Sequence, residues 1–290
     1  MADMEQRPIS IRAHDDGQDR WHMADAPAAR ALRGAIIGYS DYSEHTTSFA
    51  ARRELASTQT VMILCLADPL EIIGADGQAI MLRAGEGFIG GFADATSLSR
   101  GLGPQAGVHV HMPWTTLAQI AGCPAGAIAN RVVSLDDLAI VGAGDLGGRL
   151  VEANGPDRRF DLLDAFFGRR LVDAPVPDPV IAWAVRRLQA DPDLRVDALA
   201  RHCDWSRRHF IARFRDATGM TPGRFARLAR FERFWSGLAA DPSARLSDLA
   251  QDAGYHDEPH LARSVRDFAD MTPGQLRLSI IPEGGGFAAG

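Results

Sequence analysis

The alternation of apolar and polar positions divides the chain into a strand-like part and a helical part. Between residues 46 and 112, short apolar runs such as 61–66 and 70–73 are separated by polar or glycine-containing turns. Runs of this length and spacing predict several short strands that form a small sheet or barrel. After Pro113 the apolar positions recur every three or four residues, which predicts helices. We expect them at 115–121, 124–131, 136–153 and 158–171.

Three other segments lack such a pattern. Residues 1–45 are polar and irregular, so we expect a loosely docked N-terminal arm. Prolines occupy every second position from 175 to 179, where they block helix continuation and stiffen the chain. A proline-rich linker is therefore expected over 173–178. Consecutive glycines near the C-terminus predict a flexible tail over 280–290.

Beyond the linker every apolar pattern has the period of a helix. The expected helices cover 179–189, 195–203, 206–218, 222–238, 246–253, 257–269 and 273–278. The sequence therefore predicts an α+β domain over 46–172, in which a small sheet or barrel is combined with helices. An all-α domain over 179–279 follows, in which two helix-turn-helix units are joined by a long helix.

The all-α part contains an internal repeat. Met220-Thr221-Pro222-Gly223 recurs as Met271-Thr272-Pro273-Gly274, 51 residues later, whereas the preceding Leu199-Ala200 recurs as Leu249-Ala250 after 50. The turn that precedes the second helix is therefore one residue longer in the second copy, at 255–257. A duplicated unit of this size indicates two copies of one supersecondary structure.

The second helix of each copy has one apolar face and one polar face. Phe210, Phe214 and Ala217 form the apolar stripe of the first copy, and Leu261, Val265 and Phe268 form that of the second. Ser206 and Asp257 stand where a side chain caps the first turn of a helix. The apolar stripes agree between the copies and the outward faces differ, as expected of two helices that contact different half-sites in a non-palindromic DNA site.

The segment from about 179 to 278 resembles the AraC/XylS family of bacterial transcription regulators. The resemblance rests on Leu199-Ala200, Ser206 to Phe210 and Phe214-Arg215 in the first copy. In the second copy it rests on Leu249-Ala250, Ala253-Gly254-Tyr255, His260-Leu261, Arg263, Phe268 and Met271-Thr272-Pro273. It implies two recognition helices that enter successive major grooves, which are about 34 Å apart.

We predict DNA contacts from the outward faces. They are Ser206, Arg207, Arg208, Ile211, Ala212 and Arg215 in the first copy, and Glu258, Pro259, Ala262, Arg263 and Arg266 in the second. Arginine suits guanine and phosphate, and small apolar side chains suit the thymine methyl group. Ser206 and Arg207 are expected to position the helix on the DNA backbone. Glu258 would repel phosphates, and the family often has Gly at the position of Asp270.

The charge distribution is consistent with this assignment. The net charge is −6, but residues 178–282 hold 16 basic against 14 acidic side chains, so the acidity lies in the N-terminal part. All 31 basic residues are arginine, a bias that we attribute first to genomic composition. DNA affinity must therefore depend on where the charges lie, not on their sum.

Other chemistry is weakly represented. His109 and His111 would share one face of a strand, either as metal ligands of a cupin-like barrel or as solvent-facing residues on an edge strand. No motif of a nucleophilic enzyme or of a cofactor site is present, so we expect no enzyme and no cofactor. The three cysteines are far apart, and no run of 18 apolar residues occurs, which favours a cytoplasmic protein without membrane contact.

The sequence thus predicts a DNA-binding transcription regulator with an operator as its partner. The N-terminal domain would bind a small-molecule effector, form a homodimer, or both, and contact with RNA polymerase is a further expectation. Two alternatives stay open. The first is a cupin-like metal enzyme fused to a DNA-binding module. The second is an oligomeric DNA-binding protein that needs no effector.

Overall fold

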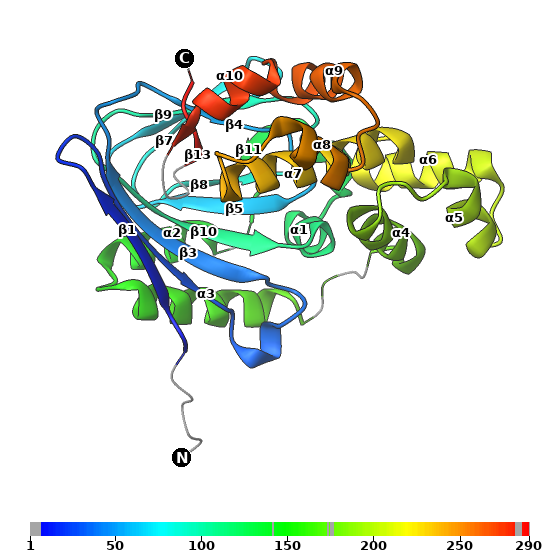
Figure 1. The fold of residues 1–290 in the computed structure, drawn as a ribbon. Coiled ribbons are helices and arrows are strands. Elements are labelled where there is room, and N and C mark those ends of the chain that lie inside the picture. Colours follow the sequence, from blue (N-terminus) through cyan, green and yellow to red (C-terminus); the bar gives the residue numbers. More distant parts are fainter. Residues whose placement is uncertain (1–6, 141, 173, 175–176, 282–285, 290) are drawn as a thin grey trace.

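A computed structural model describes residues 7–140, 142–172, 174, 177–281 and 286–289. The N-terminal part is built on two antiparallel sheets (Figure 1). The larger sheet has the strand order β1 (Ser10–Asp15), β2 (Arg20–Ala26), β3 (Gly38–His45), β10 (Gln105–Met112), β5 (Thr60–Cys65), β8 (Gly87–Gly90) and β11 (Val132–Ser134). The smaller sheet has the order β4 (Arg52–Glu54), β9 (Ser97–Gly101), β6 (Leu70–Ile73) and β7 (Ala79–Leu82).

Helices cover one face of the larger sheet, and the smaller sheet covers part of the other. The covering elements of the N-terminal part are η1 (Arg30–Leu32), α1 (Trp114–Ala121), η2 (Ala125–Ile128), α2 (Ala143–Glu152) and α3 (Pro156–Arg170). On β10, Val108 and Val110 are fully buried and belong to the helix-side core. On the opposite face, Cys65 and Phe88 pack with Leu70 and Ile72 of the smaller sheet to form a second core.

The C-terminal part is entirely helical up to residue 278. It comprises α4 (Pro179–Ala190), α5 (Val196–His202), α6 (Arg207–Thr218), α7 (Pro222–Ala240), α8 (Leu246–Asp252), α9 (Glu258–Ala269) and α10 (Pro273–Leu278). The predicted fold class is confirmed: an α+β domain of sheets and helices precedes two helix-turn-helix units joined by a long helix. Among the described residues, no helix is long and apolar enough to cross a membrane.

Two predictions about the ends of the chain were wrong. The described residues 7–45 do not form an irregular arm, because β1, β2 and β3 lie there and β3 pairs with the central strand β10. The described residues of the expected tail, 280–281 and 286–289, are not free either. β12 (Ile280–Ile281) pairs with β13 (Gly286–Phe287), and the backbone N–H of Ala289 donates to the carbonyl oxygen of Ala51 at 2.9 Å.

Two smaller predictions also need adjustment. The helix expected over 136–153 begins only at Ala143, where Gly142 takes a left-handed conformation with φ of 81°. The segment 124–131 forms only the short helix η2 and is followed by β11, which we did not predict. The proline-rich linker predicted over 173–178 lies partly outside the described residues.

One continuous hydrophobic core runs through both parts of the molecule. Phe92 of the sheet domain packs against Phe225 of α7 with ring centroids 5.4 Å apart, and Phe225 packs against Phe214 of α6 at 5.5 Å. All three rings are essentially buried. A shared apolar interface of this kind restricts independent motion of the two parts.

Candidate nucleic-acid interface

Each helix-turn-helix unit is closed by the same backbone turn. In the first unit the N–H of Trp205 donates to the carbonyl oxygen of Ala200 at 3.0 Å. In the second unit the N–H of Tyr255 donates to the carbonyl oxygen of Ala250 at 2.8 Å. A left-handed residue precedes each donor, Asp204 in one unit and Gly254 in the other. The extra residue of the second copy, His256, follows this turn, so the turn itself has the same length in both units.

The helices that follow the turns are capped as their sequences predict. The Ser206 hydroxyl accepts a hydrogen bond from the N–H of His209 at 3.2 Å at the start of α6. The Asp257 carboxylate accepts one from the N–H of His260 at 2.7 Å at the start of α9. Side-chain caps of this kind satisfy amides that the first turn leaves unpaired.

The apolar stripes of α6 and α9 lie in the core, as predicted. Phe210 and Phe214 are fully buried on α6. Leu261, Val265 and Phe268 are at most 3% exposed on α9. Between the two units, α7 is capped by Thr221 and carries buried aromatic side chains along its length. The two second helices are therefore held by packing on one side and leave their other side open.

The structure places every predicted DNA contact at the surface, although not equally. Ile211 and Ala262 are half-buried, and the other nine are exposed: Ser206, Arg207, Arg208, Ala212, Arg215, Glu258, Pro259, Arg263 and Arg266. Arg207 is partly neutralised, because its Nε lies 2.8 Å from the Asp197 carboxylate. Glu258 opens α9 and points into solvent, where its charge suits the helix N-terminus but not a phosphate.

Ion pairing separates the arginines of this region into two groups. Arg213, Arg227 and Arg230 pair with carboxylates within the protein. Arg208, Arg215, Arg263 and Arg266 are exposed and make no ion pair or side-chain hydrogen bond within the described residues, and the same holds for Arg186, Arg187 and Arg245 elsewhere in the helical part. Only the first four lie on the faces of α6 and α9 that the sequence placed outward. An unpaired guanidinium binds an anion without first breaking an internal pair.

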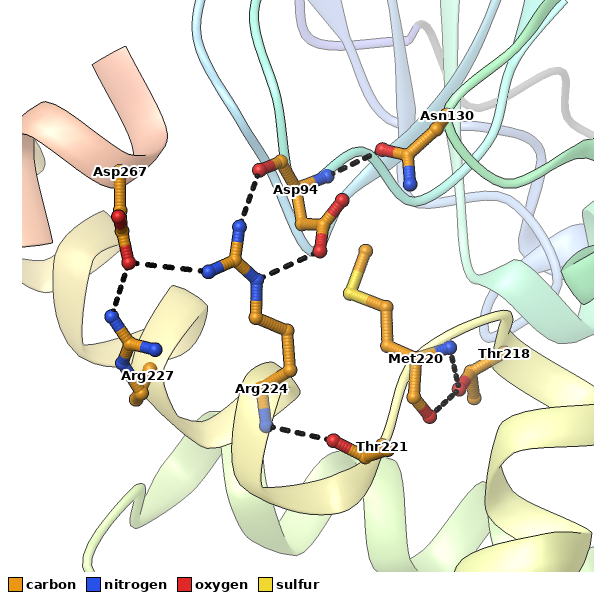
Figure 2. A network of polar contacts seen from close by, with 8 residues as sticks. All are labelled: Asp94, Asn130, Thr218, Met220, Thr221, Arg224, Arg227 and Asp267. Atoms are coloured by element: carbon orange, nitrogen blue, oxygen red, sulfur yellow. Dashed lines mark hydrogen bonds and ion pairs between the residues drawn. The ribbon is translucent and has the colours of Figure 1, made fainter. Parts of the chain in front are cut away.

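A polar network that the sequence did not predict connects the sheet domain to the second unit (Figure 2). Arg224 of α7 contacts the Asp94 carboxylate through Nε at 2.7 Å and the Asp94 carbonyl oxygen at 3.0 Å. Its Nη1 lies 3.3 Å from Asp267 of α9, and its guanidinium covers the Phe268 ring at 4.3 Å. Asp94 is held in turn by Asn130, whose side-chain oxygen accepts from the Asp94 N–H at 2.7 Å.

A second polar contact fixes the middle of α7. The Glu232 carboxylate accepts hydrogen bonds from the Ser57 hydroxyl at 2.7 Å, from the Thr58 N–H at 2.9 Å and from the Thr58 hydroxyl. Burial raises the pKa of Glu232 above its usual value, although these donors oppose that effect. Glu232 is the one acidic residue of α7. This isolated acidic position is the feature of the sequence that could have indicated a special role.

The histidines on β10 share one face of the strand, as predicted, but they do not lie on an edge strand. β10 pairs with β3 and β5, so it is a central strand and not an edge strand. His109 and His111 face the space between the two sheets, with Tyr42 beside His109 at a ring distance of 4.8 Å. Burial lowers the pKa of His109 to about 3, so its imidazole is neutral at physiological pH.

This cluster contains a serine, a histidine and an aspartate, the residue types of a catalytic triad, but they are hydrogen-bonded in a different order. The buried Ser40 hydroxyl donates to the Asp25 carboxylate at 2.5 Å, so Nε2 of His111, 3.2 Å away, donates to Ser40. His111 therefore does not act as a base toward the hydroxyl. Within the described residues, no group of three or more His, Cys, Asp or Glu side chains is arranged to hold a metal ion.

Comparison with known proteins agrees with the C-terminal assignment. Residues 199–279 match the family model described as "Helix-turn-helix domain". A curated relative from Haemophilus influenzae, named "Uncharacterized HTH-type transcriptional regulator", is 29% identical over 92 residues. That match covers 32% of this chain and only 30% of the relative. The C-terminal part, with its two units, therefore matches a helix-turn-helix domain.

The fold of the whole chain is similar to that of ToxT from Vibrio cholerae. A crystal structure of apo ToxT from strain SCE256 matches with a TM-score of 0.52 and 9% identity, over 84% of this chain and 98% of ToxT. The unsaturated fatty acid-bound form of wild-type ToxT gives the same TM-score and identity, over 86% and 96%. At such low identity the match concerns the fold alone: a sheet domain followed by the helix-turn-helix units.

Proposed function

We propose that this protein is a sequence-specific DNA-binding transcription regulator. The observation that carries the proposal is the pair of exposed helix faces on α6 and α9, each with two arginines that are unpaired within the described residues. The family match over 199–279 and the regulator from Haemophilus influenzae support the same function. The partner is an operator in double-stranded DNA, bound through two successive major grooves.

The contacts divide by chemistry. Arg208, Arg215, Arg263 and Arg266 are the proposed base or phosphate contacts, and Ala212 with the half-buried Ile211 would contact a thymine methyl group. Ser206 and Arg207 position α6 on the DNA backbone. Because the outward faces of α6 and α9 differ, each subunit recognises a site without internal symmetry.

Footprinting on the promoter region of its own gene tests the proposal, at stated salt because phosphate contacts weaken steeply as salt rises. Arg263→Ala should weaken operator binding by about 1–3 kcal/mol if this side chain contacts a base. Arg131→Ala is the matched control, since Arg131 is exposed in the sheet domain and absent from both recognition helices. Equal affinities of the two variants would remove Arg263 from the interface, and absence of any footprint would overturn the function.

The sheet domain is proposed to bind a small-molecule effector. Two observations support this. ToxT, which shares the fold, has been crystallised bound to an unsaturated fatty acid. The face of the larger sheet that is turned toward the smaller one carries a cluster of polar rings, Tyr42, His109 and His111. Neutral imidazoles can donate and accept hydrogen bonds to such a ligand, and they are also the form of histidine that binds a metal ion. Metal analysis of the purified protein tests the cupin-like enzyme, which requires one metal ion per chain.

Self-association and contact with RNA polymerase complete the proposal. In the larger sheet β1 pairs only with β2, so within the described part of the chain its outer edge and the exposed Ile11 are available to a second copy. Light scattering across a concentration series tests the homodimer. A protein that is dimeric and DNA-bound with no response to any ligand would favour the effector-independent alternative.

A further inference from the structure

A cleft of about 350 Å³ opens between α1, α4 and α6, beside the turn at 122–124 that precedes η2. These helices lie at the junction of the two parts of the molecule (Figure 1). Its walls include Trp114 and Ala118 of α1, Ile181 of α4, and Arg213, Asp216 and Ala217 of α6. Small-molecule sites have volumes of this order, occur preferentially between domains, and combine an apolar lining with a few polar groups. The cleft lies on the helix-covered side of the sheet, apart from the histidine cluster between the two sheets.

The charges of the cleft are unequal. Nη2 of Arg213 is 2.9 Å from the Asp178 carboxylate, so these two charges compensate each other. That pairing and the cap that Asp178 supplies to α4 lower the pKa of Asp178, which keeps it ionised. The Asp216 carboxylate has no ion pair or side-chain hydrogen bond within the described residues. The cleft therefore presents an apolar surface with one uncompensated negative charge.

The cleft also borders the first recognition helix directly. The short helix η2 packs against the C-terminal end of α6, where a methyl group added at Gly126 would lie 2.6 Å from the Asp216 carbonyl oxygen. A molecule in the cleft would contact α1 and α6 together. It would therefore change the position or stability of a helix whose N-terminal half carries Arg208.

We propose that this cleft is a second ligand site, which takes a small aromatic or aliphatic cation. The apolar body packs against Trp114, Ala118 and Ile181, and the cationic group lies against Asp216. Binding there alters DNA affinity through α6, so this part of the inference rests on the proposed function. Reciprocal linkage requires that DNA then alters the affinity for the cation by the same factor.

The test uses three probes of one shape: 2-naphthylmethylammonium, 2-naphthylmethanol and 2-naphthoate. Calorimetric titration of the full chain should rank the cation first and the anion last. Asp216→Asn should weaken cation binding about fivefold and change binding of the alcohol by less than twofold. Asp252→Asn is the matched control, since Asp252 is exposed on α8 and does not line the cleft. Ala118→Leu fills the cleft and should abolish binding of the cation and of the alcohol.

The outcomes separate the site from the function. Binding of the anion in preference to the cation, or cation binding that survives Ala118→Leu, would overturn the site. Circular dichroism of each variant shows whether a lost affinity reflects a lost fold, and Asp216→Asn, which keeps the side chain's shape, gives a second, milder perturbation. A protein that footprints DNA but ignores the cation contradicts the site alone. One that binds the cation and never DNA contradicts the proposed regulator.

Discussion

The two helix-turn-helix units have nearly the same backbone but different attachments to the sheet domain. The first unit is attached by packing: η2 lies against the end of α6, and the Phe92–Phe225–Phe214 contact continues the core behind it. The second unit is attached by charge, through Arg224 to Asp94 on one side and Asp267 on the other. Close packing depends little on salt but does not tolerate added side-chain volume. A partly exposed ion pair tolerates changes in volume but is weakened by salt.

The residues that end α6 and α9 show the difference most directly. Both are left-handed, Gly219 with φ of 79° and Asp270 with φ of 57°. A methyl group at Gly219 would lie 2.4 Å from Cβ of Ala129, which follows η2, so only glycine fits. Asp270, in contrast, is exposed and carries a Cβ in the same conformation. One repeat position is thus fixed by the sheet domain in the first unit and left free in the second.

The largest expected effect is therefore at Gly219. Gly219→Ala should lower the free energy of unfolding by roughly 3 kcal/mol, since it combines left-handed strain with an overlap against Ala129. Urea unfolding measures it. Gly223→Ala is the matched control, because an added methyl group there meets nothing within 4 Å. Combining Gly219→Ala with Ala129→Gly should remove the overlap and leave the backbone strain, so part of the lost stability should return. If none returns, the segment that follows η2 does not contact this residue closely.

The next effect concerns Glu232, which fixes the helix that both units share. Glu232→Ala should cost about 1–3 kcal/mol, because the buried Thr58 N–H loses its acceptor. Since burial raises the pKa of Glu232 above 4.5, the folded state binds this proton more tightly than the unfolded state does. The contribution of Glu232 to stability therefore falls as pH rises through its folded pKa. Unfolding of wild type and Glu232→Gln from pH 5 to 8 should increasingly favour Gln, and a constant difference would contradict this.

The sequence predicted the C-terminal part well because its signals are local. Each helix carries its own period, and caps such as Ser206 and Thr221 lie within three residues of the amides that they satisfy. The outward arginines follow from the same periodicity, so most of the candidate interface could be predicted from the sequence. The sheet domain was harder, since β3 carries Ser40, Tyr42 and Glu44 on the face between the sheets and lacks the apolar alternation of a strand. No local pattern connects Asp94 to Arg224, which are 130 positions apart.

A smaller effect is expected at the ionic attachment of the second unit. Asp94→Ala should cost about 1 kcal/mol, because the side chains of the Asp94–Arg224 pair are still 23% and 29% exposed to solvent. A double-mutant cycle with Arg224→Ala isolates the pair, and Asp137→Ala, at an exposed loop residue, is the control. The coupling should shrink when salt is raised to about 1 M, where the Debye length is about 3 Å. If salt instead weakens the Gly219–Ala129 coupling equally, the contrast between the two units is wrong.

The smallest expected effect is at Asp270, where a substitution should stabilise the protein instead of destabilising it. Asp270→Gly should raise the free energy of unfolding by about 0.5–1 kcal/mol, because glycine adopts the left-handed conformation without a Cβ penalty and the helix end loses an unfavourable negative charge. Asp270→Ala separates the two causes, since it removes the charge and keeps the strain. The expected order of stability is Gly above Ala, with only the Ala variant sensitive to strain. Were Ala the more stable, left-handed strain would not govern this position. A loss for Ala as large as that of Gly219→Ala would instead show that the end of α9 is as constrained as that of α6, and the two units would be attached alike.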